Sequence, residues 1–483
     1  MNKHLLPDEL AGFPVATTPE ELGIPTSALL QFQKDLDAMP SLHGVIALRH
    51  GKVFLCTSWA PFDLESKGIL HSLSKSFTSA AIGIAQSEGY LNINDTLLKY
   101  FPEYEDAVTD EKMRVLTLRD LLTMTSGHAD CAMAQLRTAP TEWVRCFLAT
   151  QLQYAPGTHF AYNSAGTHML AAVVHKTTGQ NVREYLMPRL FEPLDILPGL
   201  WENSSEDINC GGWGLLLSTA DIAKFAQCLL QNGSWNGKQL IPADYLAEAT
   251  RKQSDNSRNE RADWKLGYGY QFWRSQHGYR GDGAFGQLAI VIPELDLAIA
   301  LNSTVHNFQD LLDLIWKFVE QLQDAPLPPC SPELLARSDA LMTDRFDAWL
   351  AAGAQGKPST RSVHNVLFHS NELTASFDAS STRCALTFRY PNHHQEQLAA
   401  SFLHPDGLLN SLTLNSDRSH FYRATARWQD DHTVVIRALS TDMRWQDTYT
   451  IDLSPEGTIS FHAQWSLGIQ NSHKQFLTSV VRG

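Results

Sequence analysis

The chain has few of the features that mark secreted, membrane-bound or disulfide-stabilised proteins. Its 483 residues include only seven cysteines, which are widely spaced and form no C-x-x-C pair. Scattered thiols of this kind are typical of a reducing compartment. No apolar run approaches the ~20 residues that a membrane helix needs, and residues 1–23 lack the apolar core of a secretory signal. We therefore expect a cytoplasmic protein without a membrane partner.

Clustered positive charge and the common cofactor motifs are also missing. The 52 acidic residues outnumber the 38 Lys and Arg residues, which gives a net charge of −14. Binding to a phosphate backbone needs clustered Lys and Arg, so we expect no nucleic-acid partner. No H-E-x-x-H, Walker or dinucleotide-binding pattern occurs. His393-His394 follows Pro391-Asn392, which favours an exposed turn over a metal site. We therefore expect neither metal nor cofactor.

The composition that remains is that of a globular protein, with 43% hydrophobic and 19% charged residues. The length allows two or three domains. Residues 1–325 mix helix and strand signals. They include strands at His43–Arg49 and Lys52–Trp59 around the turn residues His50-Gly51. A second strand pair, Leu288–Ile292 and Leu295–Leu301, lies near the end of this part. These signals predict an α+β domain.

The composition changes after residue 325. The Pro-rich stretch 326–329 indicates a stiff linker, and a helical pattern follows over 333–350. From residue 361 the apolar residues alternate with period two, as in Leu386/Phe388/Tyr390 and Ile451/Leu453. We therefore divide the chain into a domain over 1–325, a linker and helix over 326–360, and an all-β domain over 361–483. The short strands of the last part predict an antiparallel barrel or sandwich.

Ser72 and Lys75 are the first candidate catalytic residues. They open an apolar helical run, and a spacing of three places hydroxyl and amine one turn apart on one helix face. A serine hydroxyl needs a nearby base to become a nucleophile, and a partly desolvated lysine can serve. Lys75 is the only lysine in the chain with a serine three residues before it. Because S-x-x-K arises by chance about once in a chain of this length, other landmarks must support it.

Two later segments carry complementary groups. Tyr162-Asn163-Ser164 places a phenol at the start of a predicted helix, where it could exist partly as phenolate and carry a proton. Taken alone, Tyr162 is better explained as a half-buried aromatic residue. Gly281-Asp282-Gly283-Ala284 precedes the second strand pair. Glycines at a strand edge let a substrate lie against the backbone, and the N–H that follows can complete an oxyanion hole. Taken alone, this segment would be a turn or bulge.

Together and in this order, these segments resemble the serine β-lactamase and penicillin-binding-protein superfamily. The resemblance is greatest to the class C β-lactamase-like branch, which includes esterases, D-amino-acid peptidases and nylon-oligomer hydrolases. It covers about residues 18–322 and includes LLTMTSGH, GG-x-G-LLLSTADIAKF and G-x-G-x-x-G-Q. It implies an antiparallel sheet flanked by helices, with an inserted helical subdomain.

The resemblance also implies roles for individual residues. Ser72 would be the nucleophile that forms an acyl-enzyme, Lys75 its base or charge stabiliser, and Tyr162 a second proton carrier. The N–H groups of Ser72 and Ala284 would form the oxyanion hole. Ser164, Asp282 and Gly283 would border the substrate. Whether Lys75 or Tyr162 takes the proton cannot be decided from the sequence.

Two motifs depart from the family pattern. The second motif is usually Tyr-x-Asn, whereas Ser164 stands at the third position here and the asparagine, Asn163, one earlier. The third motif usually begins with Lys or His, whereas the aligned triplet here is Gly281-Asp282-Gly283. The cation that binds the penicillin carboxylate is therefore missing, unless Arg280 replaces it with a register shift of one.

These observations lead to a serine hydrolase that acts on an ester, amide or peptide-like substrate. The two altered motifs keep alternatives open: a non-catalytic binding protein that retains the fold, or a β-lactamase or D,D-peptidase proper. If Asp282 faces the substrate, a neutral or amine-bearing acyl group is favoured over a free carboxylate. If it points into solvent, it has no such effect.

Overall fold

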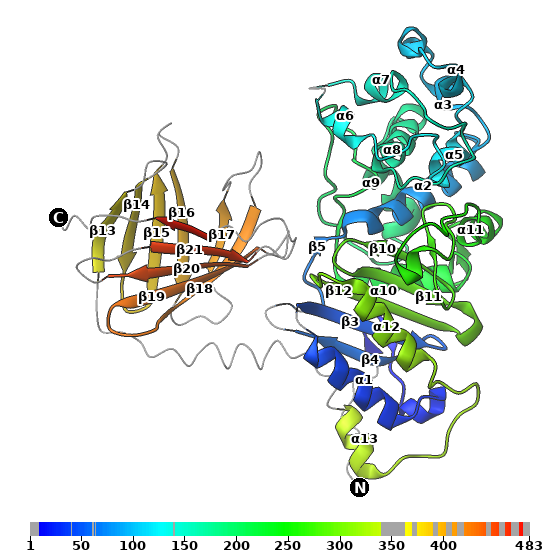
Figure 1. Ribbon diagram of the computed structural model, residues 1–483. Helices are drawn as coiled ribbons and strands as arrows, with labels where there is room; N and C mark the ends of the chain where they lie inside the picture. Colours follow the sequence, from blue (N-terminus) through cyan, green and yellow to red (C-terminus); the bar gives the residue numbers. More distant parts are fainter. Residues whose placement is uncertain are drawn as a thin grey trace. The chain divides into compact units, whose positions relative to one another are not determined.

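The computed structural model describes residues 9–39, 41–59, 62, 64–138 and 141–339, and after these the strand-rich ranges 363–369, 374–389, 395–401, 408–412, 420–440, 446–453, 459–464 and 473–476. The chain forms two compact units. The first comprises Met1–Thr57 and Ile69–Thr343, and the second comprises Ser58–Gly68 and Asp344–Gly483. Figure 1 shows the labelled elements of each unit.

The first unit is built on a six-stranded antiparallel sheet, in which the strand order is β4-β3-β12-β11-β10-β9. Its strands are β3 (Leu42–Arg49), β4 (Lys52–Ser58), β9 (Trp273–Arg274), β10 (Tyr279–Gly283), β11 (Gln287–Ile292) and β12 (Leu297–Ser303). Both predicted strand pairs are present. His50 and Gly51 connect β3 to β4 with φ of +53° and +72°, the conformation expected for a tight hairpin turn.

Three helices pack on this sheet: α1 (Thr26–Ala38), α10 (Thr219–Leu230) and α12 (Phe308–Val319). Phe32 of α1 stacks on Phe318 of α12, with ring centroids 4.4 Å apart, and Phe54 of β4 lies 6.0 Å from the same ring. α10 contacts β3, β11 and β12. Ser218 caps α10 in a capping box with Asp221, which agrees with the helix start indicated by the sequence.

The residues between β4 and β9 hold the inserted helical part of the unit (Figure 1). α2 (Ser74–Ser87) is buried along almost its whole length, and Phe77 stacks on Phe225 of α10 at 3.9 Å. α2 is thereby fixed next to the sheet, with its first turn directly after the predicted nucleophile. The remaining helices of this segment are α3 (Leu97–Tyr100), α4 (Glu111–Arg114), α5 (Leu118–Leu122), α6 (Met133–Thr138), α7 (Trp143–Leu148), α8 (Ser164–Thr178), α9 (Val182–Leu186) and α11 (Ala243–Thr250).

Shorter elements complete the first unit: β1 (Glu9–Leu10), β2 (Phe13–Pro14), β5 (Gly68–Ile69), β6 (Leu216–Leu217), β7 (Ser234–Trp235) and β8 (Lys238–Gln239). The helix predicted over 333–350 is described only as α13 (Pro332–Asp339), and its second half lies outside the described residues. No helix in the described part of the chain is both long and apolar enough to cross a membrane.

The second unit contains one ten-stranded sheet with the neighbour order β13-β14-β15-β16-β18-β19-β20-β21-β22, and β17 pairs with β18. These pairings are antiparallel except for a single parallel bridge between β16 and β18. Alternating residues such as Leu386, Phe388 and Ile451 form its buried core, in agreement with the period-two pattern. The strands are β13 (Val363–His369), β14 (Thr374–Ala379), β15 (Arg383–Arg389), β16 (Gln395–Ser401), β17 (Leu408–Leu412), β18 (His420–Trp428), β19 (Thr433–Ser440), β20 (Gln446–Asp452), β21 (Ile459–Gln464) and β22 (His473–Phe476).

Candidate active site

Ser72 lies in a short 3-10 helix, His71–Leu73, directly before α2. The preceding residue, His71, has φ of +48°, which is uncommon for a residue with a side chain and indicates a backbone held by its surroundings. Ser72 is half-buried. Lys75 lies in the first turn of α2, and its Nζ is 3.0 Å from Ser72 Oγ. The hydroxyl and amine therefore meet as the S-x-x-K spacing predicts.

Lys75 is enclosed by neutral hydrogen-bond acceptors. Besides Ser72, its amine donates to Ser164 Oγ at 3.0 Å and to the carbonyl of Gly212 at 2.7 Å. The side chain is fully buried, and this burial lowers the pKa of Lys75 to about 7. The nearby thiol of Cys131 and carboxyl of Asp282 oppose the decrease. The amine can thus be neutral or protonated near neutral pH.

The start of α8 explains the altered second motif. Asn163 is the N-cap of α8, and its side-chain oxygen accepts from the N–H of Ala165 at 3.1 Å and of Ala132 at 3.2 Å. Its side chain therefore holds backbone groups, as N-cap asparagines commonly do. The next residue, Ser164, contacts Lys75. The hydroxyl at the third motif position is the group that the fold directs to the amine.

Tyr162 lies between Lys75 and an aromatic cluster. Lys75 Nζ is 4.8 Å from the centre of the Tyr162 ring, and the ring stacks on Trp273 at 5.4 Å. Its hydroxyl shares a side-chain hydrogen bond with Ser72. Burial, together with the charge of Asp282, raises the pKa of Tyr162 well above its usual range. Burial therefore disfavours the partial phenolate that the sequence allowed for Tyr162.

β10 lies directly against the turn that carries Ser72. A Cβ added to Gly283 would be 2.0 Å from the carbonyl oxygen of Leu70, and one added to Gly281 would be 2.5 Å from the side chains of Leu73 and Ser76. Only glycine permits this close approach. Ala284, which follows the strand, is half-buried like Ser72. The sequence thus brings Ala284 beside the segment that carries Ser72.

Two residues with positive φ, His71 and Phe285, lie where the Ser72 segment meets the end of β10. Phe285, next after Ala284, has φ of +69°, and its ring contacts the ring of His71 edge-on at 5.4 Å. The carbonyl of Phe285 accepts from the N–H of Val305 at 3.0 Å and from the hydroxyl of Ser303. These contacts fix the backbone directly after Ala284.

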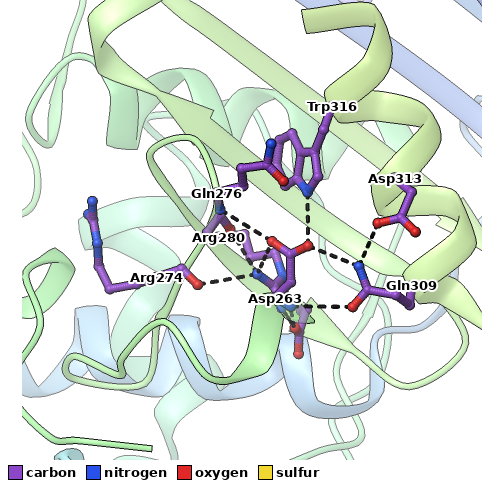
Figure 2. Close-up of polar contacts among 9 residues, drawn as sticks. Asp263, Arg274, Gln276, Arg280, Gln309, Asp313 and Trp316 are labelled. Carbon is purple, nitrogen blue, oxygen red and sulfur yellow. Dashed lines mark hydrogen bonds and ion pairs between the residues drawn. The ribbon is translucent and has the colours of Figure 1, made fainter. Parts of the chain in front are cut away.

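Asp282 does not point into solvent, because its side chain is only 6% exposed. Its carboxyl group forms an ion pair with the guanidinium of Arg280, with both Nε and Nη2 at 3.0 Å, and accepts a hydrogen bond from Trp264. Arg280 itself is fully buried in this pair. Because its guanidinium group is already paired with the carboxyl groups of Asp282 and, as Figure 2 shows, of Asp263, Arg280 does not replace the Lys or His with which the third motif usually begins.

Three groups near the site had weak or no signals in the sequence. The carbonyl of Gly212 binds Lys75, and only the local GG-x-G pattern pointed to that segment. Cys131 lies close enough to act electrostatically on Lys75 and Tyr162, and nothing in the sequence distinguished it from the other cysteines. Trp264 donates to Asp282, a contact that depends on tertiary structure alone.

Among the residues that the structure describes, no group of three or more His, Cys, Asp and Glu side chains is arranged to hold a metal ion. His393-His394 lies outside the described residues. His128 is buried, and its two ring nitrogens form hydrogen bonds with Ser126 and Thr150. Burial lowers the pKa of His128 to about 4. It is a structural residue.

Comparisons with known proteins agree with this architecture. The family described as Beta-lactamase matches residues 32–319. Two curated relatives are Protein flp of Staphylococcus aureus strain MW2, 24% identical over 165 residues, and an uncharacterized protein of Alkalihalophilus pseudofirmus, 27% identical over 208 residues. The matches cover 32% and 39% of this chain, and 33% and 56% of those proteins. The chain thus spans between a third and about half of the length of the relatives it matches.

Two solved structures share the fold. A candidate 6-aminohexanoate-dimer hydrolase from Bacillus anthracis matches with a TM-score of 0.51 and 19% identity, covering 65% of this chain and 87% of that one. A candidate β-lactamase from Bacteroides dorei matches with a TM-score of 0.50 and 17% identity, covering 61% and 98%. Because the family match covers more than half of the residues, the chain belongs to the Beta-lactamase family, within the serine β-lactamase and penicillin-binding-protein superfamily.

Proposed function

We propose that the chain is a serine hydrolase that transfers the acyl group of an ester or amide first to Ser72 and then to water. The observation that carries this proposal is the position of the Lys75 amine, 3.0 Å from Ser72 Oγ and buried so that its pKa falls to about 7. A neutral amine at this distance can take the hydroxyl proton as the serine attacks. A lysine with an ordinary pKa would be protonated and unable to do so.

The remaining groups fit the other demands of acyl transfer. In the first step Ser72 Oγ bonds to the carbonyl carbon, and the negative charge that develops on the carbonyl oxygen would be stabilised by the N–H groups of Ser72 and Ala284. The leaving alcohol or amine then departs with a proton, for which the Tyr162 hydroxyl is a second carrier. Water releases the acyl group in a second attack of the same kind. Ser164 and Gly283 would border the bound substrate.

The charges of the site favour a neutral or amine-bearing acyl group. Asp282 contributes a buried carboxyl group, and Arg280 is occupied by protein acids. Near Asp282 a substrate carboxylate would lie beside another acid, and the guanidinium of Arg280 is already paired. This supports an ester or amide hydrolase over a β-lactamase that binds the penicillin carboxylate.

Covalent labelling tests the proposal directly. The wild-type protein and Ser72→Ala would be treated with a fluorophosphonate and examined by intact-mass spectrometry. We expect one adduct on the wild type and none on Ser72→Ala. Absence of an adduct on the wild type, or its persistence in Ser72→Ala, would sink the enzymatic proposal and favour a non-catalytic binding protein. A parallel panel of p-nitrophenyl esters, D-amino-acid amides and nitrocefin tests the substrate class, and faster turnover of nitrocefin than of the esters would contradict it.

A further inference from the structure

The turn between β10 and β11 carries the N–H of Ala284, one of the two proposed oxyanion donors. The turn comprises Ala284, Phe285 and Gly286. Phe285 and Gly286 both have positive φ, of +69° and +87°. Glycine adopts such a φ freely, whereas an aromatic residue does so only where its surroundings hold it. The contacts that hold Phe285 in this conformation therefore determine the direction of the backbone groups of the turn.

Ser303, the last residue of β12, supports the second half of the turn. Its hydroxyl donates to the carbonyl of Phe285, and its Oγ lies 3.1 Å from the carbonyl oxygen of Gly286. The N–H of Val305 also donates to the Phe285 carbonyl, at 3.0 Å. Ser303 is fully buried, so no solvent competes for its hydroxyl. One buried hydroxyl thus faces two successive carbonyls of the turn.

Gln287, the first residue of β11, supports the first half of the turn. Its Nε2 donates to the carbonyl of Ala284 at 3.3 Å and to the main-chain carbonyl of Ser303. One buried side-chain amide therefore joins the start of the turn to the end of β12. Gln287 is also the last residue of the G-x-G-x-x-G-Q element, and the proposed reaction assigns it no role.

The carbonyl of Gly283 fixes the direction of the Ala284 N–H. This carbonyl accepts from the N–H of Gly286 at 3.2 Å, so it points into the turn. In a trans peptide, the C=O of one residue and the N–H of the next point in opposite directions. The Ala284 N–H therefore points out of the turn. It keeps this direction only while the residues after it keep their positive φ.

Contacts on both sides of Ala284 place the turn against the segment that carries the nucleophile. On one side, a Cβ added to Gly283 would be 2.0 Å from the carbonyl oxygen of Leu70. On the other side, the ring of Phe285 lies 5.4 Å from the ring of His71. Leu70 and His71 are the two residues directly before the nucleophile. The turn and this segment therefore lie side by side, as two N–H groups that bind one oxygen require.

We propose that Ser303 and Gln287 are positioning residues that hold the turn so that the Ala284 N–H binds the oxyanion formed when Ser72 attacks. This inference rests on the proposed acyl transfer. During attack, the serine proton passes to the lysine amine, the Oγ–C bond forms, and the π electrons of the substrate carbonyl move to its oxygen. The N–H stabilises that charge. Without the two side chains, Phe285 relaxes to an ordinary negative φ and the N–H turns away.

Removal of the Ser303 hydroxyl tests the catalytic part. In Ser303→Ala, the maximal rate of p-nitrophenol release from an ester should fall at least about tenfold, whereas the half-saturating ester concentration should stay near the wild-type value, because the N–H acts mainly in the transition state. Complete loss of an oxyanion donor, about 10²–10³-fold in kcat, sets the upper limit. Ser254→Ala is the matched control. It also removes a buried hydroxyl that faces two carbonyls, those of Thr123 and Tyr268, and should leave the rate near that of the wild type.

A second substitution separates positioning from a general loss of packing. Phe285→Gly removes the side chain that resists a positive φ, so the turn needs less support from Ser303. In the Phe285→Gly background, Ser303→Ala should therefore lower the rate by a several-fold smaller factor than it does alone. A merely structural role of the hydroxyl would lower the rate by the same factor in both backgrounds, and this result would contradict the proposal.

Crystal structures of the variants test the geometry without any need for activity. We expect φ of Phe285 to leave the positive region in Ser303→Ala. Gln287→Met, which keeps the length of the side chain and removes the amide, is the second variant in case Ser303→Ala does not fold. If the turn keeps its conformation in the folded variants, Ser303 and Gln287 do not hold it and the proposal is wrong.

The two kinds of measurement also distinguish this inference from the proposed function. A displaced turn with an unchanged rate of acylation would overturn the inference, because the Ala284 N–H would then not stabilise the oxyanion. If the wild type does not acylate at all, the proposed function and the catalytic part fail together. The crystal structures would still decide whether Ser303 and Gln287 hold the turn.

Discussion

The two sides of the site hold their charged groups in different ways. On the helix side, Lys75 is surrounded by neutral acceptors from Ser72, Ser164 and Gly212. On the strand side, Arg280 and Asp282 are bound directly to each other. Burial lowers the pKa of Lys75 to about 7, because none of its hydrogen-bond partners among the described residues carries a charge. A buried group with neutral partners exchanges a proton readily, whereas the ion pair with Arg280 opposes the rise in the pKa of Asp282 that burial causes.

This difference predicts that the strand side matters most for stability. In Arg280→Met two buried carboxyl groups, those of Asp282 and Asp263, lose their shared cation. Breaking a buried ion pair by removing one partner typically costs about 3–5 kcal/mol of unfolding free energy. We expect a loss of this size in the unfolding transition of the first unit, measured by chemical denaturation.

The control for this change is Arg145→Met. Arg145 forms an ion pair with Asp106 at an exposed position, where screening by water leaves little net stabilisation. Its unfolding midpoint should stay close to that of the wild type. An Arg280→Met protein as stable as the Arg145→Met control would show that the strand-side charges are not a stabilising network.

The helix side should have the largest effect on the rate at which Ser72 is acylated. Lys75→Met keeps the length of the side chain but removes the amine, so acylation of Ser72 should slow by at least about 100-fold, the usual scale for the loss of a general base. The rate constant is measured from p-nitrophenol release or from the growth of a fluorophosphonate adduct. A variant that acylates at the wild-type rate would remove Lys75 from the mechanism and leave Ser72 in place.

At acid pH, Lys75→Met should raise the unfolding free energy, whereas Arg280→Met should lower it. The pKa of Lys75 is lowered to about 7 in the folded protein from an ordinary value of 10.5. Below pH 7 the folded protein must bury an ammonium group, so this residue destabilises the fold there, and the penalty is relieved as the pH rises from 7 towards 10.5. Lys75→Met should therefore gain most stability over the wild type below pH 7. A constant difference across this range would contradict the buried, titrating amine.

The helix side was also the part that the sequence predicted better. Spacing along one helix determines which side chains share a turn, so Ser72 and Lys75 could be paired from the sequence, and the resemblance supplied Tyr162. The strand hairpins were predicted from their turn residues and from strand-like apolar runs. These are local signals, and they were sufficient for the elements on which the site is built.

The strand side could not be predicted for a physical reason. Whether Asp282 faces solvent or the interior depends on which segments cover that face of β10, and its partner Trp264 comes from outside the strand. The contacts from Asp263 to Trp316 and Gln309 join segments about 50 residues apart, and no periodic pattern records them. The role of Asn163 as a helix cap, in contrast, could have been recognised from its place immediately before an apolar helix.

The smallest of the predicted effects, on the rate of acylation, is expected from Ser164→Ala on the helix side of the site. This change removes one of the three acceptors around the Lys75 amine, while Ser72 Oγ and the Gly212 carbonyl remain. A hydrogen bond between neutral groups contributes about 0.5–1.5 kcal/mol net, so acylation should slow by up to about tenfold. Ser87→Ala, at the far end of α2, removes a hydroxyl that donates to the Ile84 carbonyl and should leave the acylation rate unchanged. If Ser164→Ala slowed acylation as strongly as Lys75→Met, Ser164 would be part of the proton path itself. If it had no effect, two acceptors would be enough to hold the amine, and the third contact would belong to the packing of α8 against α2.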